Sequence, residues 1–138
     1  MRGTTTQVEG RVVVTVLKLW GDLDGSSYQD AIAEAKRLYD QGARHMLLDL
    51  GDVPYMSSAG VIALQSMAML LRGDEPPDPE MGWAAHHSLD RERERGFQQQ
   101  FKLLNPSPRV DQVLEVIGIK SYLEVYTDLD AAVASFSA

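Results

Sequence analysis

Two adjacent serines are the residues of this chain best placed to take part in chemistry. Ser57 and Ser58 lie between a short apolar run, residues 46–50, and a segment with helical periodicity that begins at Val61. A short apolar run between turn residues is typical of a buried strand. The first turn of a helix leaves backbone N–H groups unpaired and carries the positive end of the dipole. The serines therefore have two interpretations: a structural N-cap, and the site of an anion or phosphate group.

Two further groups of residues have types that could carry chemistry. Asp22 and Asp24 follow an apolar run and form an acidic pair, but carboxylates in a turn are typically turn formers and helix-dipole partners. His86 and His87 are adjacent in a proline-flanked segment. They lack the i,i+4 spacing that directs two imidazoles toward one ion, so we predict no metal site.

The sequence contains none of the common catalytic motifs. The glycine-rich phosphate-binding and dinucleotide-binding motifs, the nucleophile elbow and the HExxH zinc motif are all missing from the 138 residues. The two serines have no recognisable histidine and aspartate partners. We therefore predict that the chain is not an enzyme, and that it has no catalytic residue and no cofactor.

Composition limits the function further. The length of 138 residues, with 44% hydrophobic and 24% charged residues, predicts a single globular domain over residues 1–138. The net charge of −7 argues against binding nucleic acid directly or an anionic membrane surface. Because cysteine is missing, disulfides and thiolate chemistry are excluded. The first residues lack the apolar core of a signal peptide and no apolar run approaches 18 residues, so we expect a cytoplasmic protein.

Hydrophobic periodicity and turn residues predict an α/β order of elements. Residues 73–100, which include three prolines and a run of alternating charges, are predicted to be a polar insert after the second main helix. Strands alternating with helices indicate a mixed sheet in which an opening hairpin is followed by parallel strands. Strands are predicted at residues 4–8, 11–20, 46–50, 101–104 and 122–126, and four helices after caps at Ser26 or Ser27, Ser57 or Ser58, Ser107 and Thr127. Tyr55 and Met56 are expected to pack beneath the serine loop.

Three motifs occur in order along the chain and together are more specific than each one alone. They are Gly-Asp-Leu-Asp at residues 21–24, the stretch from Leu47 to Val61 that contains Tyr-Met-Ser-Ser-Ala-Gly, and Asn-Pro-Ser-Pro-Arg-Val at residues 105–110 followed by Leu-Glu-Val-Ile-Gly-Ile at 114–119. This pattern resembles a STAS domain, in particular the bacterial anti-sigma factor antagonists. The resemblance covers residues 4–137 except the insert, and it implies a mixed sheet of about five strands with about four helices.

The resemblance also implies a function. In that family a serine at the start of the second helix is phosphorylated by an anti-sigma factor serine kinase. The unphosphorylated domain binds this kinase and frees a sigma factor, so it regulates transcription indirectly, and a PP2C-type phosphatase restores the binding form. Ser58 matches the acceptor, with Ser57 as second choice, although Ser57 occupies the position of an aspartate in the usual Asp-Ser-Ser/Thr-Gly motif.

The implied partner surface consists of Asp22, Asp24, Tyr55, Ser57, Ala59 and Gly60. The alternative hypothesis keeps the fold without the switch. The chain would then be a constitutive STAS scaffold, or a subunit of a larger signalling or transporter-linked complex. The substituted aspartate and the long insert are the features that favour this alternative.

Overall fold

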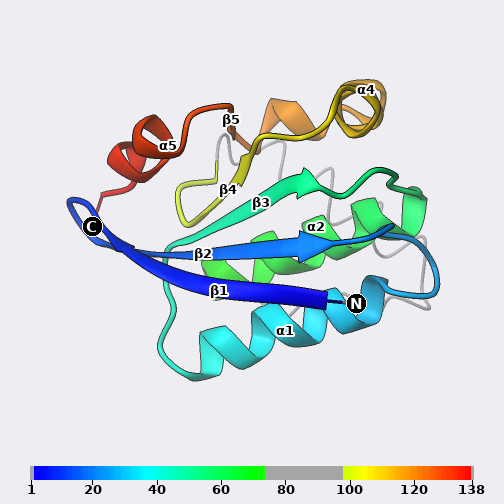
Figure 1. Cartoon of the computed structure of the whole chain (residues 1–138). Coiled ribbons are helices and arrows are strands. Elements are labelled where there is room, and N and C mark those ends of the chain that lie inside the picture. Colours follow the sequence, from blue (N-terminus) through cyan, green and yellow to red (C-terminus); the bar gives the residue numbers. More distant parts are fainter. Residues whose placement is uncertain (1, 74–97, 138) are drawn as a thin grey trace.

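The protein is built on one five-stranded sheet with the strand order β1-β2-β3-β4-β5 (Figure 1). The computed structural model describes residues 2–73 and 98–137. The first strand pairs antiparallel with the second, and every later pair is parallel, which confirms the predicted mixed sheet with an opening hairpin. The strands are β1 (Arg2–Glu9), β2 (Val13–Trp20), β3 (Met46–Asp52), β4 (Phe101–Leu104) and β5 (Val125–Tyr126).

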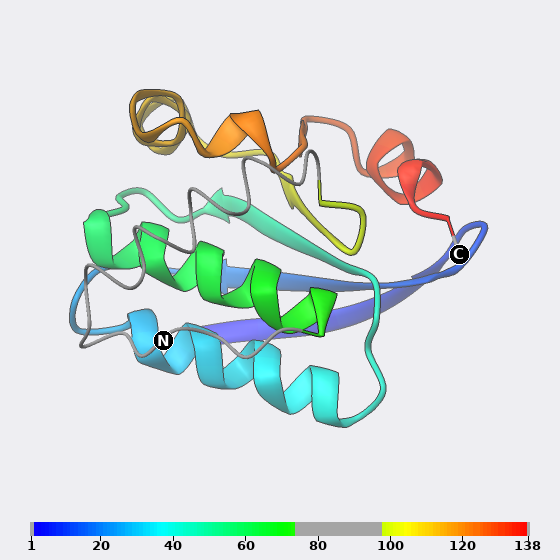
Figure 2. The same cartoon turned by 180° about the vertical axis from the view of Figure 1, so that it is seen from behind.

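Four helices flank this sheet in the described part of the chain, as predicted. They are α1 (Tyr28–Asp40), α2 (Ser58–Arg72), α4 (Pro108–Ile117) and α5 (Leu129–Ser135), with a short 3-10 turn, η1 (Ile119–Ser121), after α4. Figures 1 and 2 show that α1 and α2 lie on one face of the sheet. Within these ranges, no helix is both long enough and apolar enough to cross a membrane. Most of the predicted insert, residues 74–97, lies outside the described residues.

Alternating residues of the strands supply two separate cores. Leu17 and Leu48 point into the larger core, which also contains most of the buried residues of α1, α2 and α4. Val14 and Leu47 belong to a smaller core that contains the buried residues of α5. Because successive side chains of a strand point to opposite faces, α5 covers the face opposite to α1 and α2.

The sequence-based boundaries are wrong at two positions near the C-terminus. The predicted last strand begins too early, because the chain turns through η1 after Gly118, and Tyr122 is fully buried from that turn. The final helix is capped by Asp128 rather than by Thr127. The carboxylate of Asp128 accepts a hydrogen bond from the backbone N–H of Ala131 at 3.0 Å, which is the geometry of an N-cap.

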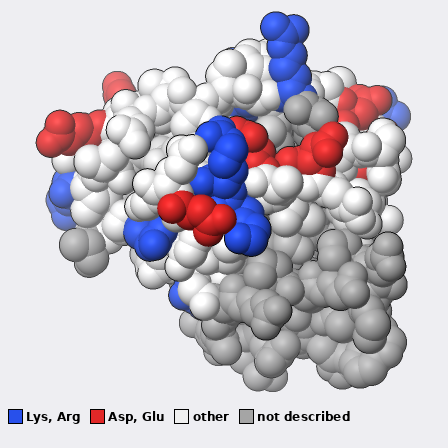
Figure 3. Space-filling model, turned by 90° about the horizontal axis from the view of Figure 1, so that it is seen from below, with Lys and Arg blue, Asp and Glu red and all other residues white. Residues whose placement is uncertain are grey.

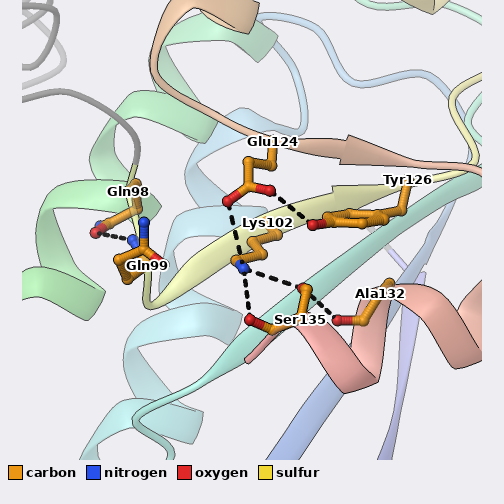
Figure 4. Close-up of polar contacts among 7 residues, drawn as sticks. All are labelled: Gln98, Gln99, Lys102, Glu124, Tyr126, Ala132 and Ser135. Carbon is orange, nitrogen blue, oxygen red and sulfur yellow. Dashed lines mark hydrogen bonds and ion pairs between the residues drawn. The ribbon is translucent and has the colours of Figure 1, made fainter. Parts of the chain in front are cut away.

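A buried lysine joins the C-terminal helix to the sheet (Figure 4). Lys102 on β4 is 1% exposed, and its Nζ donates to the carbonyl oxygen of Ser135 at 3.1 Å and to Ser135 Oγ at 3.0 Å. The same Nζ lies 3.4 Å from Glu124 Oε1 and 4.8 Å from the centre of the Phe136 ring. A buried charge is tolerated only when it is paired and hydrogen-bonded, and these contacts meet that condition while fixing the end of α5.

We predict that Lys102→Met lowers the free energy of unfolding by about 1–3 kcal/mol, since hydrogen bonds to a charged group are worth roughly 1.5–3 kcal/mol and relief of desolvation offsets part of the loss. Urea unfolding measures the change, and hydrogen exchange should accelerate in α5 first. The control is Lys36→Met, which removes an exposed ion pair with Asp40 and should change stability by less than about 1 kcal/mol. A Lys102→Met protein as stable as the wild type, with α5 equally protected, would show that the lysine does not hold this helix.

Candidate functional site

The loop that carries the two serines lies beside the acidic turn that follows β2. A short parallel bridge pairs Leu23 with Met56. The backbone N–H of Leu23 donates to the carbonyl oxygen of Tyr55 at 2.9 Å, and the N–H of Ser57 donates to the carbonyl oxygen of Leu23 at 3.0 Å. Because β2 and β3 are parallel, both loops leave the same end of the sheet, and this pairing brings the turn of residues 21–25 next to the serines.

The two serines have different environments. Ser58 is the first residue of α2 and is exposed. Ser57 is the N-cap residue, with φ −92° and ψ 179°, but its side chain makes no capping hydrogen bond. Its Oγ is buried and has no hydrogen-bond partner in the described structure. The hydroxyl that a second protein can reach is therefore that of Ser58.

Gly60 allows the start of α2 to pack directly against the acidic turn. A Cβ atom at this position would lie 2.6 Å from the carbonyl oxygen of Leu23 and 2.6 Å from Met56 Cγ. Real side chains do not approach backbone oxygens this closely, so a larger residue would push the turn and the helix apart. Gly60 thus fixes the distance between the acidic turn and Ser58.

Asp24 shapes the acidic turn through its side chain. Its Oδ1 accepts hydrogen bonds from Ser26 Oγ at 2.6 Å and from the Ser26 backbone N–H at 2.9 Å. The bond from the Ser26 hydroxyl has the larger effect and the bond from the Ser26 N–H the next, and together they hold the pKa of Asp24 below its ordinary value. The carboxylate is therefore ionised at neutral pH. Ser27 takes the N-cap position of α1, yet its Oγ donates to the carbonyl oxygen of Asp22 at 2.7 Å instead of capping the helix. The turn-former interpretation of Asp24 is confirmed, and the turn presents negative charge beside Ser58.

Tyr55 and Met56 are neighbours that differ in how deeply they are buried. Met56 is 1% exposed and packs beneath the loop as expected, whereas the expectation is wrong for Tyr55, which is 38% exposed. The guanidinium carbon of Arg109, at the start of α4, lies 5.4 Å from the centre of the Tyr55 ring. Tyr55 thus lies at the surface, where the Arg109 guanidinium stacks over its ring.

Arg109 was not singled out among the sequence-predicted site residues. One signal could have found it: Arg109 follows β4 as the serine loop follows β3, and the carboxyl ends of neighbouring parallel strands meet at one edge of a sheet. Ser107 Oγ lies 3.5 Å from the carbonyl oxygen of Val53, which connects the two loops.

Outside the serine loop and the acidic turn, positive and negative side chains lie next to one another on the surface. Figure 3 shows lysine and arginine side chains beside aspartate and glutamate side chains on the face seen from below. On α1, Lys36 pairs with Asp40 at 3.0 Å and Arg37 pairs with Glu34. No cluster of three or more potential metal ligands occurs in residues 2–73 and 98–137, and the His86-His87 pair lies outside the described residues.

These observations define a mixed-sheet α/β domain with an exposed serine at the first turn of its second helix. The chain belongs to the STAS domain family, whose model matches residues 5–73. This confirms the family resemblance drawn from the three motifs.

The relatives of this chain include anti-sigma factor antagonists. The protein named "Putative anti-sigma factor antagonist BtrV" of Bordetella bronchiseptica is 26% identical over 136 residues, which cover 99% of this chain and 95% of that protein. The fold is similar to that of the protein described as a "putative anti-sigma factor antagonist" of Thermotoga maritima, with a TM-score of 0.64, 16% identity, and coverage of 94% of this chain and 90% of that one. It is also similar to the unphosphorylated anti-sigma factor antagonist SpoIIAA, with a TM-score of 0.56, 21% identity, and coverage of 94% and 92%. Antagonists of this kind are non-enzymatic regulators, which confirms the prediction that the chain is not an enzyme.

We predict that Gly60→Ala destabilises the protein by about 1–3 kcal/mol, the usual cost of forcing an extra methyl group into a filled space. Urea unfolding measures this loss, and NMR shifts should change in residues 22–24 as the turn is displaced. Gly25→Ala, in the same turn, is the matched control, because a Cβ there meets no atom within 4 Å. Equal stability of the two variants would mean that the turn and the helix can separate at little cost.

Proposed function

We propose that this chain is an anti-sigma factor antagonist that binds an anti-sigma factor serine kinase while unphosphorylated and is released once Ser58 is phosphorylated. The observation that carries the proposal is the exposed Ser58 at the start of α2, beside the acidic turn of Asp22 and Asp24. The similarity to anti-sigma factor antagonists supports it. Binding the kinase would free a sigma factor in the cytoplasm and so regulate transcription indirectly, and a PP2C-type phosphatase would return the chain to its binding form.

The proposed partner surface divides into contacting and supporting residues. Asp22 and Tyr55 are exposed, and Asp24, Ser57 and Ala59 are half-buried, so each of the five has part of its surface open to a partner. Gly60 is buried against the carbonyl oxygen of Leu23. We therefore assign Gly60 the role of holding the surface together, and the other five the role of contacting the partner.

Electrostatics explains how one phosphate would switch the complex without unfolding the domain. The kinase transfers the γ-phosphoryl group of ATP to Ser58 Oγ, the hydroxyl proton is lost and ADP leaves. The modification adds about −1.5 to −2 charges at pH 7. Within the free domain, the N-terminus of α2 tolerates an anion. In a docked interface the phosphate must lose water close to the negative turn, which weakens the complex.

A second candidate function rests on Ser57. The neutral side chain stands where the family motif has an aspartate, and its Oγ makes no capping bond. If the cognate kinase needs that carboxylate, the chain is a constitutive scaffold or a subunit of a larger signalling or transporter-linked complex. Co-purification with a stable non-kinase partner, at equal yield for wild type and Ser58→Asp, would favour this function.

We predict that the serine kinase encoded in the same operon or genome transfers phosphate from ATP to the wild-type chain, and that Ser58→Ala abolishes the transfer. Ser57→Ala is the matched control and should keep most of it, because Ser57 Oγ is buried. Mass spectrometry of the intact protein counts the phosphate groups. Ser58→Asp should weaken kinase binding about tenfold or more, equivalent to about 1.4 kcal/mol.

Two results would contradict the proposed switch. One is equal phosphorylation of the Ser58→Ala and wild-type proteins, and the other is the failure of every cognate serine kinase to modify the chain.

A further inference from the structure

Arg109 is a cation next to the serine loop that has no carboxylate partner among the described residues. Arg109 is exposed, and its guanidinium carbon makes a cation–π contact with Tyr55, 5.4 Å from the centre of the ring. Lys18, at the end of β2, is by contrast already neutralised: its Nζ lies 3.0 Å from Asp52 Oδ2 and 4.0 Å from Asp49 Oδ2. Arg109 is thus available to a new anion near the loop, whereas Lys18 is not.

The position of Arg109 follows from contacts between the loops after β3 and β4. Ser107 caps α4 by accepting a hydrogen bond from the Val110 N–H at 3.3 Å, and its Oγ reaches the carbonyl oxygen of Val53. Arg109 is the second residue of α4, so the contacts of Ser107 fix its backbone. Its long side chain extends to Tyr55, three residues before Ser58 in the adjoining loop.

Resting on the proposed phosphorylation of Ser58, we propose that Arg109 is the counter-ion of the phosphate, and that its guanidinium leaves the Tyr55 ring to pair with the phosphate oxygens. The balance of interactions favours this movement. An exposed cation–π contact is a weak interaction, whereas a charge-assisted pair between guanidinium and phosphate is strong and often bidentate. The turn that pairs with the serine loop carries Asp22 and Asp24, whose negative charges repel a phosphate.

The pairing would change the proposed docking surface in two places at once. Phosphorylation adds negative charge at Ser58, and it also separates Arg109 from Tyr55. Exposed tyrosine and arginine side chains are the residue types that most often anchor protein–protein interfaces. The modified domain would therefore lose an ordered arginine–tyrosine pair from the surface that faces the kinase.

The test uses the full chain with phosphoserine introduced at position 58 during translation, so that no kinase is needed. Phosphorus NMR during a pH titration gives the second pKa of the phosphate, which is about 6 in the absence of nearby charges. A guanidinium favours the dianion and lowers this pKa, while Asp22, Asp24 and Asp52 raise it. We expect the midpoint in Arg109→Gln to lie about 0.5–1 pH unit above that of the chain with Arg109 intact. Arg109→Lys should restore part of the difference.

Arg44→Gln is the matched control. Arg44 also stacks on a tyrosine, with its guanidinium carbon 3.9 Å from the centre of the Tyr39 ring, but it precedes β3 and so lies at the opposite end of the sheet from Ser58. Its loss should leave the phosphate midpoint unchanged. All variants keep the acidic turn and the helix N-terminus, so the difference between them isolates the charge of Arg109, and circular dichroism verifies that each one is folded.

Equal phosphate midpoints in the Arg109→Gln chain and the chain with Arg109 intact would overturn the inference. This failure is distinct from a failure of the proposed function. If no cognate kinase modifies Ser58, the function fails although the titration still reports on Arg109. If a kinase modifies Ser58 but the midpoints agree, the inference alone fails.

Discussion

The close approach of α2 to the turn after β2 is the constraint on which the rest of the site depends. The carbonyl oxygen of Leu23 accepts a hydrogen bond from the Ser57 N–H at 3.0 Å and occupies the space that a Cβ of residue 60 would need. A parallel β2–β3 pair brings the two loops to one end of the sheet but does not by itself join them. The glycine and the Leu23–Met56 bridge place the two loops in direct contact, so the acidic turn is held beside the serines.

Charge at this end of the molecule is arranged around helix termini. The helices α1, α2 and α4 all follow strands that end at the same edge of the sheet, so three positive dipole ends gather there. The carboxylates of Asp22, Asp24 and Asp52 offset part of this field, and Lys18 in turn neutralises Asp52. The helix N-termini favour a further anion while the aspartates oppose it, and in the proposed switch Arg109 would offset the opposing charge.

Much of this fold could be predicted because local signals and tertiary packing agree. Ser107 and Pro108 mark the start of α4, and Gly73 and Gly118 end their helices in the left-handed conformation. The predictions were wrong where two neighbouring residues compete, as Thr127 and Asp128 do for one cap, and where a core position is filled from a turn, as by Tyr122. The Tyr55–Arg109 stack joins residues 54 positions apart, so it depends on the β3–β4 register and on side-chain rotamers that no local pattern specifies.

The two serines are adjacent in the sequence but differ in how accessible their hydroxyl groups are. Ser57, the N-cap residue, has an extended backbone and a buried Oγ that makes no capping bond, whereas Ser58, the first residue of the helix, is exposed. Exchanging the family's aspartate for serine at the enclosed position removes a fixed negative charge without exposing a second hydroxyl. The exchange therefore leaves one accessible hydroxyl, that of Ser58, and makes its surroundings less negative. In the proposed switch, the neutral side chain of Ser57 would repel a phosphate on Ser58 less than an aspartate would, and Arg109 would pair with that phosphate directly.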